Sequence, residues 1–326
     1  MKIVAVLLVA LVTCASFAQE ATLKLTHTIP LNGVKGRFDH FAIDPQGQRL
    51  FIAALGNNTL EVIDLAAGKR IQSVPSMSKP TGVLYLSEAK QVCVANGDDG
   101  TLKILDGGDF KVLKNLIGLD DADNLRFNAK TKLAWLGYAD GSLGVIEATT
   151  AKRVASVQLA KHPESFQLEQ TGNRIFVNVP DAKQVAIVDR EKRAVVATWP
   201  MEKFRANFPM ALDEAHHRLF IGCRSPARLV VLDTDSGKPV ADLAISGDID
   251  DLSFDATRAR LYLSCGEGFI DVIGQRSPDK YELRERIPTR TGARTGFFSS
   301  ELDHFYLAVP QRGDQSAELR VFKTQD

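Results

Sequence analysis

The stretch RLFIAALGNNTLEVIDLAAGKRIQSV, residues 49–74, decides the fold class of this 326-residue chain. Its three apolar runs, RLFIAAL, LEVIDL and RIQSV, are separated by the polar segments GNNT and AAGK. Asn, Gly and Lys favour turns and β-branched residues favour extended backbone, so the stretch predicts three short strands. A long helix would need apolar residues three and four positions apart, and we find no convincing stretch of that kind beyond the N-terminal segment.

The same pattern recurs about every 42 residues. Each unit has an apolar run, a polar turn and a second apolar run, as in FAIDPQGQRLFIA, residues 41–53. We take as anchor the residue seven before the aromatic residue, or its equivalent, in the second run; the anchors are Asp44, Leu86, Asn128, Glu169, Asp213, Asp255 and Ser299. Seven units of four short strands predict an all-β fold, a seven-bladed β-propeller with four antiparallel strands per blade.

The two ends of the chain fit this prediction. Unit seven has strands at Thr295 to Phe298, His304 to Val309 and Glu318 to Phe322, and the sequence then ends one strand short. The segment LKLTHTIPL, Leu23 to Leu31, is a spare strand that we expect to complete the last blade and close the ring, which removes a free sheet edge. A β-sandwich is the alternative, but it explains neither the regular period nor the matching ends.

Three segments carry a family resemblance: residues 49–71, VANGDDGTLKILD (94–106) and LVVLDTDSGKPVADL (229–243). They resemble the YVTN-type repeat of the YncE-like exported bacterial propellers, over essentially the whole chain after the N-terminal segment. The resemblance implies a propeller outside the cytoplasm, in a family of binding and scaffold proteins, some linked to nucleic acid. Its wider relatives hydrolyse lactones or carry redox cofactors. It is specific for fold and not for function, because propellers host many unrelated activities.

The N-terminal segment MKIVAVLLVALVTCASFAQE predicts a secretory signal peptide, residues 1–18. Lys2 is its basic region, Ile3 to Val12 its apolar region, and small residues favour cleavage after Ala18. A buried strand, or a lipoprotein anchor at Cys14, is the weaker reading. We therefore expect residues 19–326 to be one propeller domain in the periplasm or secreted, without a transmembrane segment.

Net charge and cysteine content limit the kinds of partner and cofactor that we expect. Forty basic and forty acidic residues cancel, which gives no electrostatic reason to expect a nucleic-acid footprint. Only Cys93, Cys223 and Cys265 follow the signal segment, too few for a disulfide framework, and no zinc or c-type haem motif occurs. We expect all three to be unpaired cysteines in the core, with a Cys223–Cys265 disulfide as the less favoured alternative. We also expect the protein to be a monomer.

Candidate site residues come from the positions five and four before each anchor. In a propeller these positions lie beside the opening of the central channel, which we call the mouth. Four of the seven first positions are carboxylates and one is Arg; with neighbours, the predicted ligand-binding set is Arg37, Asp39, His40, Asp123, Asn124, Glu164, Asp250, Asp251 and Arg294. Any single Asp here is more often a strand-capping turn residue, and Arg294 could serve only to neutralise Asp250. As a set, converging carboxylates require a compensating cation or a ligand with donors.

Three functions remain open. The first is a non-catalytic module that binds a polar small molecule, a glycan or a peptide at the mouth. The second is a hydrolase similar to propeller lactonases, in which Ca²⁺ on Glu164, Asp250, Asp123 and Asn124 polarises a carbonyl and Asp39 or His40 is the base. The third is a protein-interaction ring. We favour the first, because no nucleophile motif or cofactor motif is evident.

Overall fold

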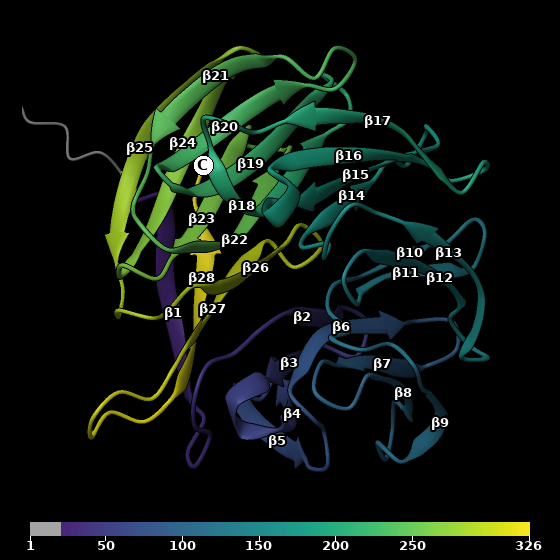
Figure 1. Cartoon of the computed structure of the whole chain (residues 1–326). Coiled ribbons are helices and arrows are strands. Elements are labelled where there is room, and N and C mark those ends of the chain that lie inside the picture. Colours follow the sequence, from purple (N-terminus) through teal and green to yellow (C-terminus); the bar gives the residue numbers. More distant parts are fainter. Residues whose placement is uncertain (1–20) are drawn as a thin grey trace, which may run out of the picture.

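The computed structural model describes residues 21–326, so the predicted signal peptide and Cys14 lie outside the described residues. Seven four-stranded antiparallel sheets form the blades of a propeller (Figure 1). The predicted fold class is therefore confirmed. The only helical turns of residues 21–326 are two 3₁₀ segments, η1 (Leu55–Asn57) and η2 (Pro180–Ala182). No helix in this part of the chain is long and apolar enough to cross a membrane.

Each blade uses four strands consecutive in sequence, except the last. Blade 1 comprises β2 (Phe41–Asp44), β3 (Arg49–Ala54), β4 (Thr59–Asp64) and β5 (Lys69–Val74). Blade 2 comprises β6 (Pro80–Leu86), β7 (Gln91–Asn96), β8 (Thr101–Asp106) and β9 (Val112–Leu116). Blade 3 comprises β10 (Leu125–Asn128), β11 (Leu133–Tyr138), β12 (Ser142–Glu147) and β13 (Lys152–Gln158). Blade 4 comprises β14 (Phe166–Leu168), β15 (Arg174–Val179), β16 (Gln184–Asp189) and β17 (Ala194–Pro200).

The remaining blades follow the same order. Blade 5 comprises β18 (Arg205–Asp213), β19 (Arg218–Ser225), β20 (Ala227–Asp233) and β21 (Pro239–Ala244). Blade 6 comprises β22 (Ile249–Asp255), β23 (Arg260–Cys265), β24 (Phe269–Ser277) and β25 (Lys280–Pro288). Blade 7 comprises β26 (Thr295–Ser299), β27 (His304–Val309), β28 (Glu318–Thr324) and the N-terminal strand β1 (Leu23–Pro30).

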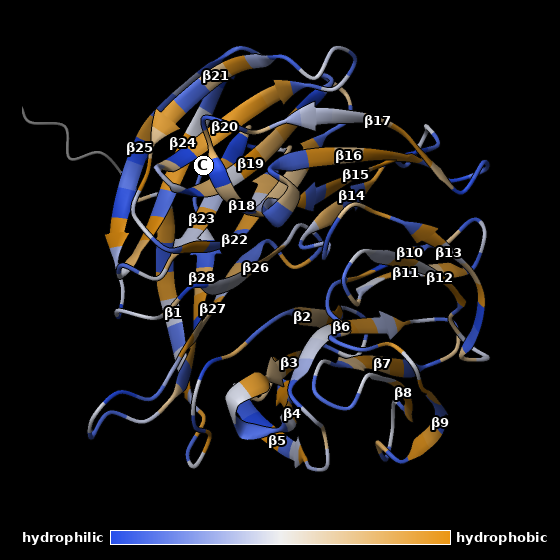
Figure 2. Cartoon of the chain, viewed as in Figure 1, coloured by the Kyte–Doolittle hydropathy of each residue, from blue (hydrophilic) through white to orange (hydrophobic). Residues whose placement is uncertain are grey.

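Hydrophobic burial lies between the blades. The buried apolar residues form seven clusters, and each joins one neighbouring pair of blades. Successive residues of a strand point to opposite faces of its sheet, so in β3 Leu50 and Ile52 pack toward blade 7 whereas Phe51 and Ala53 pack toward blade 2. This two-sided burial explains why the second strands read as continuous apolar runs (Figure 2).

Several anchors are turn residues at the end of the first strand. The Asp44 carboxylate accepts from the Gly47 backbone N–H at 3.0 Å and from Arg49 Nη2 at 2.8 Å. Asn128 accepts from the backbone N–H groups of Lys130 and Thr131. A short polar side chain that bonds its own turn stabilises the connection to the second strand, so these residues have a structural role away from the mouth.

Strand β1 closes the ring as predicted. It pairs antiparallel with β28 from Leu23↔Thr324 to Pro30↔Glu318, and the two lie side by side at opposite ends of the colour scale (Figure 1). Ile29 and Leu31 are buried in the cluster between blades 7 and 1. Closure therefore satisfies the edge of β28 and completes the core between these two blades.

The three cysteines of residues 21–326 are free and buried. Cys223 and Cys265 are therefore unbridged, and burial raises the pKa of the Cys223 thiol to about 12. Their role is that of small core side chains, as the favoured prediction had it.

Candidate binding site at the mouth of the channel

The backbone holds the mouth residues in the same way in three blades. The Asp39 N–H donates to Ala53 O and the Ala53 N–H donates to His40 O, so this pair extends the first strand of blade 1 beyond β2. Asp123 and Asn124 form the equivalent pair with Gly137, and Glu164 and Ser165 with Asn178. The sequence repeat therefore delivers equivalent positions to one region through equivalent hydrogen bonds.

These positions surround a cavity of about 220 Å³. Eight of the nine predicted site residues line it: Arg37, Asp39, His40, Asp123, Asn124, Glu164, Asp250 and Asp251. The ninth, Arg294, does not line the cavity but contacts one of its carboxylates. The repeat register thus predicts which side chains gather at the mouth.

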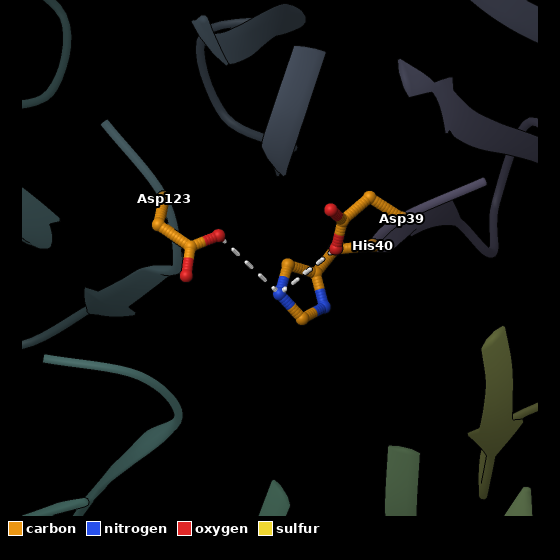
Figure 3. A group of neighbouring side chains, drawn as sticks. All are labelled: Asp39, His40 and Asp123. Atoms are coloured by element: carbon orange, nitrogen blue, oxygen red, sulfur yellow. Dashed lines mark ion pairs between the residues drawn. The ribbon is translucent and has the colours of Figure 1, made fainter. Parts of the chain in front are cut away.

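His40 lies among three carboxylates from three blades. Its Nε2 is 3.5 Å from Asp39 Oδ1 and 3.9 Å from Asp123 Oδ1 (Figure 3). Its Nδ1 is 3.8 Å from Asp251 Oδ1. These separations exceed those of ordinary hydrogen bonds, so His40 lies close to the three carboxyl groups without a short hydrogen bond to any of them. Burial lowers the pKa of His40, against the opposing effect of Asp123, which favours a neutral ring at pH 7.

Crowding and burial shift the carboxylates in the other direction. Burial, with help from Asp250, raises the pKa of Asp39 to about 7, although Arg37 opposes the shift. Burial, followed by the charges of Asp123, Asp250 and Asp39, raises the pKa of Glu164 to about 8. The pKa values of Asp123 and Asp251 are also raised, first by burial. The carboxyl groups of Asp39 and Glu164 are therefore protonated to a large extent at neutral pH.

Asp250 is neutralised within the protein. Its carboxylate contacts Arg224 Nη2 and lies 3.1 Å from Arg294 Nε, while Arg294 Nη1 also contacts Asp248 at 2.8 Å. Arg294 thus contacts Asp250, which is the contact that its alternative role as a neutralising residue requires, and it contacts Asp248 as well. Because two guanidinium groups already hold Asp250, this carboxylate is the least suited of the set to bind a ligand.

Three carboxyl groups of the mouth have no arginine or lysine partner of this kind among the described residues. Among the described residues, no Lys or Arg nitrogen lies within 4.0 Å of the carboxylate oxygens of Asp123, Glu164 or Asp251. Asp251 accepts one bond, at 2.9 Å, from the Gly296 backbone N–H. Beside them Asn124, only 2 % exposed, lines the cavity, and its Oδ1 is buried without a hydrogen-bond partner. Three carboxyl groups of the mouth and the Asn124 amide oxygen therefore have acceptor capacity that no Lys or Arg of the described residues uses.

One group of the described residues has possible metal-ligand atoms close to one another. Ligand atoms of Asp39, His40 and Asp123 all lie within 4.8 Å of one another. This differs from the expected oxygen-only set of Glu164, Asp250, Asp123 and Asn124, since Asp250 is held by arginines and His40 takes part instead. An imidazole among two carboxylates suits a transition metal better than Ca²⁺, which prefers oxygen ligands.

The repeat register did not predict Lys79, which also lines the mouth cavity and whose Nζ is 3.4 Å from Asp121 Oδ1. Thr81 and Phe208, each five residues before its anchor, line the cavity as the register predicts, although neither belongs to the predicted ligand-binding set. Gly82 occupies the position in blade 2 that His40 occupies in blade 1. An added Cβ there would lie 2.1 Å from Asp123 O, so this blade carries no side chain at that position because the neighbouring loop passes too close.

Comparisons with known proteins agree on fold and not on function. No protein-family model and no curated protein matches the chain. Kuenenia stuttgartiensis hydrazine synthase is similar with a TM-score of 0.74 at 15% identity, over 85% of this chain and 94% of the other. A chain of the crystal structure of a mitotic checkpoint complex is similar with a TM-score of 0.79 at 12% identity, over 100% of this chain and 99% of the other. At such identities the likeness supports the seven-bladed propeller alone.

Proposed function

We propose that this protein is a non-catalytic binding module whose mouth binds a small molecule carrying a primary ammonium group. One observation carries the proposal: Asp123, Glu164 and Asp251 face one cavity from three blades and have no Lys or Arg partner within 4.0 Å among the described residues. An ammonium group supplies three donors and a positive charge, which would relieve the carboxylate repulsion and give Asn124 Oδ1 a partner.

The test is isothermal titration calorimetry and thermal shift with primary amines, including benzylamine, putrescine and glucosamine. We expect binding that Asp123→Asn and Glu164→Gln each weaken, whereas Asp181→Asn, in the exposed turn η2, leaves it unchanged. Binding of benzylamine and putrescine should strengthen from pH 6 to pH 8.5, because these amines stay protonated and select ionised carboxylates, whose pKa values burial raises. Amine binding that survives both mouth substitutions would refute the proposal.

A second candidate function rests on the Asp39, His40 and Asp123 group. A divalent transition metal held there would polarise a carbonyl or activate water for hydrolysis, as in the lactonase alternative. Thermal shift with Zn²⁺, Mn²⁺ and Ca²⁺ separates the candidates. Metal stabilisation that His40→Ala abolishes, with lactone turnover only in the metal-loaded protein, would favour hydrolysis. Amine binding without any metal response would favour the binding module.

We also propose that the protein is an exported member of the YVTN-type propellers. The repeat segments around residues 49–71 and the signal-like segment 1–18 support this proposal. Fusion of residues 1–25 to an alkaline phosphatase that lacks its own signal tests export, because that enzyme is active only outside the reducing cytoplasm. Expected results are activity and a mature N-terminus at Gln19; loss of activity on removal of Ile3 to Val12 is the control.

A further inference from the structure

A second cavity lies directly beneath the mouth. It has a volume of about 520 Å³ and is lined by the first strands of all seven blades, so it is the central channel. The residues two before each anchor, Ala42, Leu84, Arg126, Gln167, Ala211, Ser253 and Phe297, all line it. His40, Ser165 and Asp251 line both cavities, so the mouth and the channel adjoin. This volume lies in the range of small-molecule sites.

Arg126 is the one Lys or Arg side chain among the described residues that line this channel. Its guanidinium stacks over the Phe166 ring of the neighbouring blade, 5.6 Å from the centroid, and its Nη1 donates to Leu125 O at 2.8 Å. Within residues 21–326 no carboxylate oxygen lies within 4.0 Å of it. A guanidinium stays charged in proteins and has five N–H donors, so Arg126 retains unused capacity for an anion.

Aromatic side chains make up much of the remaining wall. Six rings line the channel: Phe41, Tyr85, Phe127, Phe254, Phe297 and Phe298. Phe41 and Phe297 stack at 6.1 Å, which presents two rings from neighbouring blades to one part of the channel. Ser165, Gln167, Ser253 and the Asp251 carboxyl group also line the channel, so aromatic rings, polar groups and one cation face the same cavity. This combination suits an aromatic carboxylate that carries a further polar group.

We propose that the central channel is a binding site for an aromatic carboxylate, with Arg126 as the residue that pairs with the carboxylate. His40 and Asp251 stand four residues before their anchors, whereas Arg126 stands two residues before its anchor. This difference of two residues corresponds to about 7 Å along a strand. Where the ammonium site of the proposed function is also correct, the two sites adjoin, and a para-substituted aromatic amino acid such as 4-(aminomethyl)benzoate can occupy both.

Calorimetry with benzoate, 3-phenylpropionate, benzylamine and 4-(aminomethyl)benzoate tests this site. We expect Arg126→Met to weaken benzoate binding at least about tenfold, because it removes a charge-assisted pair, and not to weaken benzylamine binding. Asp123→Asn should do the reverse. Arg153→Met is the matched control: Arg153 stacks on Tyr138 at 5.4 Å and donates to a backbone carbonyl, as Arg126 does, but it is exposed and lies outside the channel.

Circular dichroism checks folding, and Arg126→Gln, which keeps a polar chain without the charge, is the second variant with the same expected loss. Benzoate binding that is equal in wild type and both Arg126 variants would overturn the channel site, as would the absence of binding by either carboxylate at millimolar concentration. If the wild-type protein does not bind benzylamine but binds benzoate in a way that depends on Arg126, the ammonium site at the mouth is refuted and the carboxylate site in the channel is supported.

Discussion

His40 and Asp39 illustrate how neighbouring positions of one repeat unit acquire different electrostatic roles. Burial acts on both, but it lowers the pKa of the imidazole and raises the pKa of the carboxyl group, because the charged form is disfavoured in each case. Both groups therefore tend toward neutrality in the empty protein. A cation at the mouth would reverse this for Asp39, so ligand binding and proton release are expected to be linked.

Glu164 gives a prediction for stability against pH. Its pKa is about 8 in the folded protein, above the ordinary glutamate value of 4.5, so the folded state binds more protons between those two values. Stability should therefore fall as pH rises from about 5 to about 8. Glu164→Gln should flatten this fall and raise the melting temperature at pH 8. Thermal unfolding at both pH values measures it, with Glu191→Gln on an exposed turn as control. An unchanged pH profile in Glu164→Gln would contradict the prediction.

At the scale of elements, strand β1 pairs with β28 and so joins the two ends of the described chain. Some side chains of β1 are buried and others are exposed. Ile29 is 2 % exposed in the cluster between blades 7 and 1, whereas Leu25 on the same strand is 49 % exposed. Closure should therefore depend on Ile29 packing and hardly at all on Leu25.

Ile29→Ala should lower the free energy of unfolding by about 2–5 kcal/mol, because it removes buried methyl groups and leaves a cavity. Leu25→Ala should change it by less than about 0.5 kcal/mol. Urea unfolding of both variants measures the difference. Equal effects of the two substitutions would mean that β1 holds the ring through backbone pairing alone.

The elements were predictable because their signal repeats. The second strand of unit seven was expected at His304 to Val309, and β27 has those bounds. The first strand of unit five is longer than its apolar run, Met210 to Leu212, because Arg205 and Asn207 also pair with β19. Polar residues that pair as strand at the mouth leave no hydrophobic period, so the sequence could not reveal them.

The candidate site was predictable only as a set of positions. The repeat register brought Asp39, Asp123 and Glu164 to one cavity, but the side-chain pairing depends on distances that the period does not encode. Arg224 and Arg294 both hold Asp250, and His40 lies between carboxylates of other blades. Arg126 lies outside the predicted set of residues. Its signal in the sequence is that it is the only charged residue among the seven that stand two before the anchors.

For the whole molecule, the ring should fail as a unit when β1 is removed. Deletion of residues 21–31 exposes the backbone edge of β28 and the apolar cluster between blades 7 and 1. Unpaired edges and exposed apolar surface promote association, so the shortened protein should form larger species in light scattering. Deletion of the tip of the loop at residues 312–315, which lies outside the named strands, is the control and should leave a monodisperse protein.

The pairing of Leu23 with Thr324 determines on which side of the propeller the two ends of the described chain lie. Thr324 bonds Asp303, in the turn between β26 and β27, whereas the mouth lies at the other end of the strands, where β1 leads toward Arg37. Both ends of the described chain thus leave the outer rim together, on the side that faces away from the mouth. A resin, bead or membrane surface tethered to either end would leave the opening directed outward into the surrounding solution.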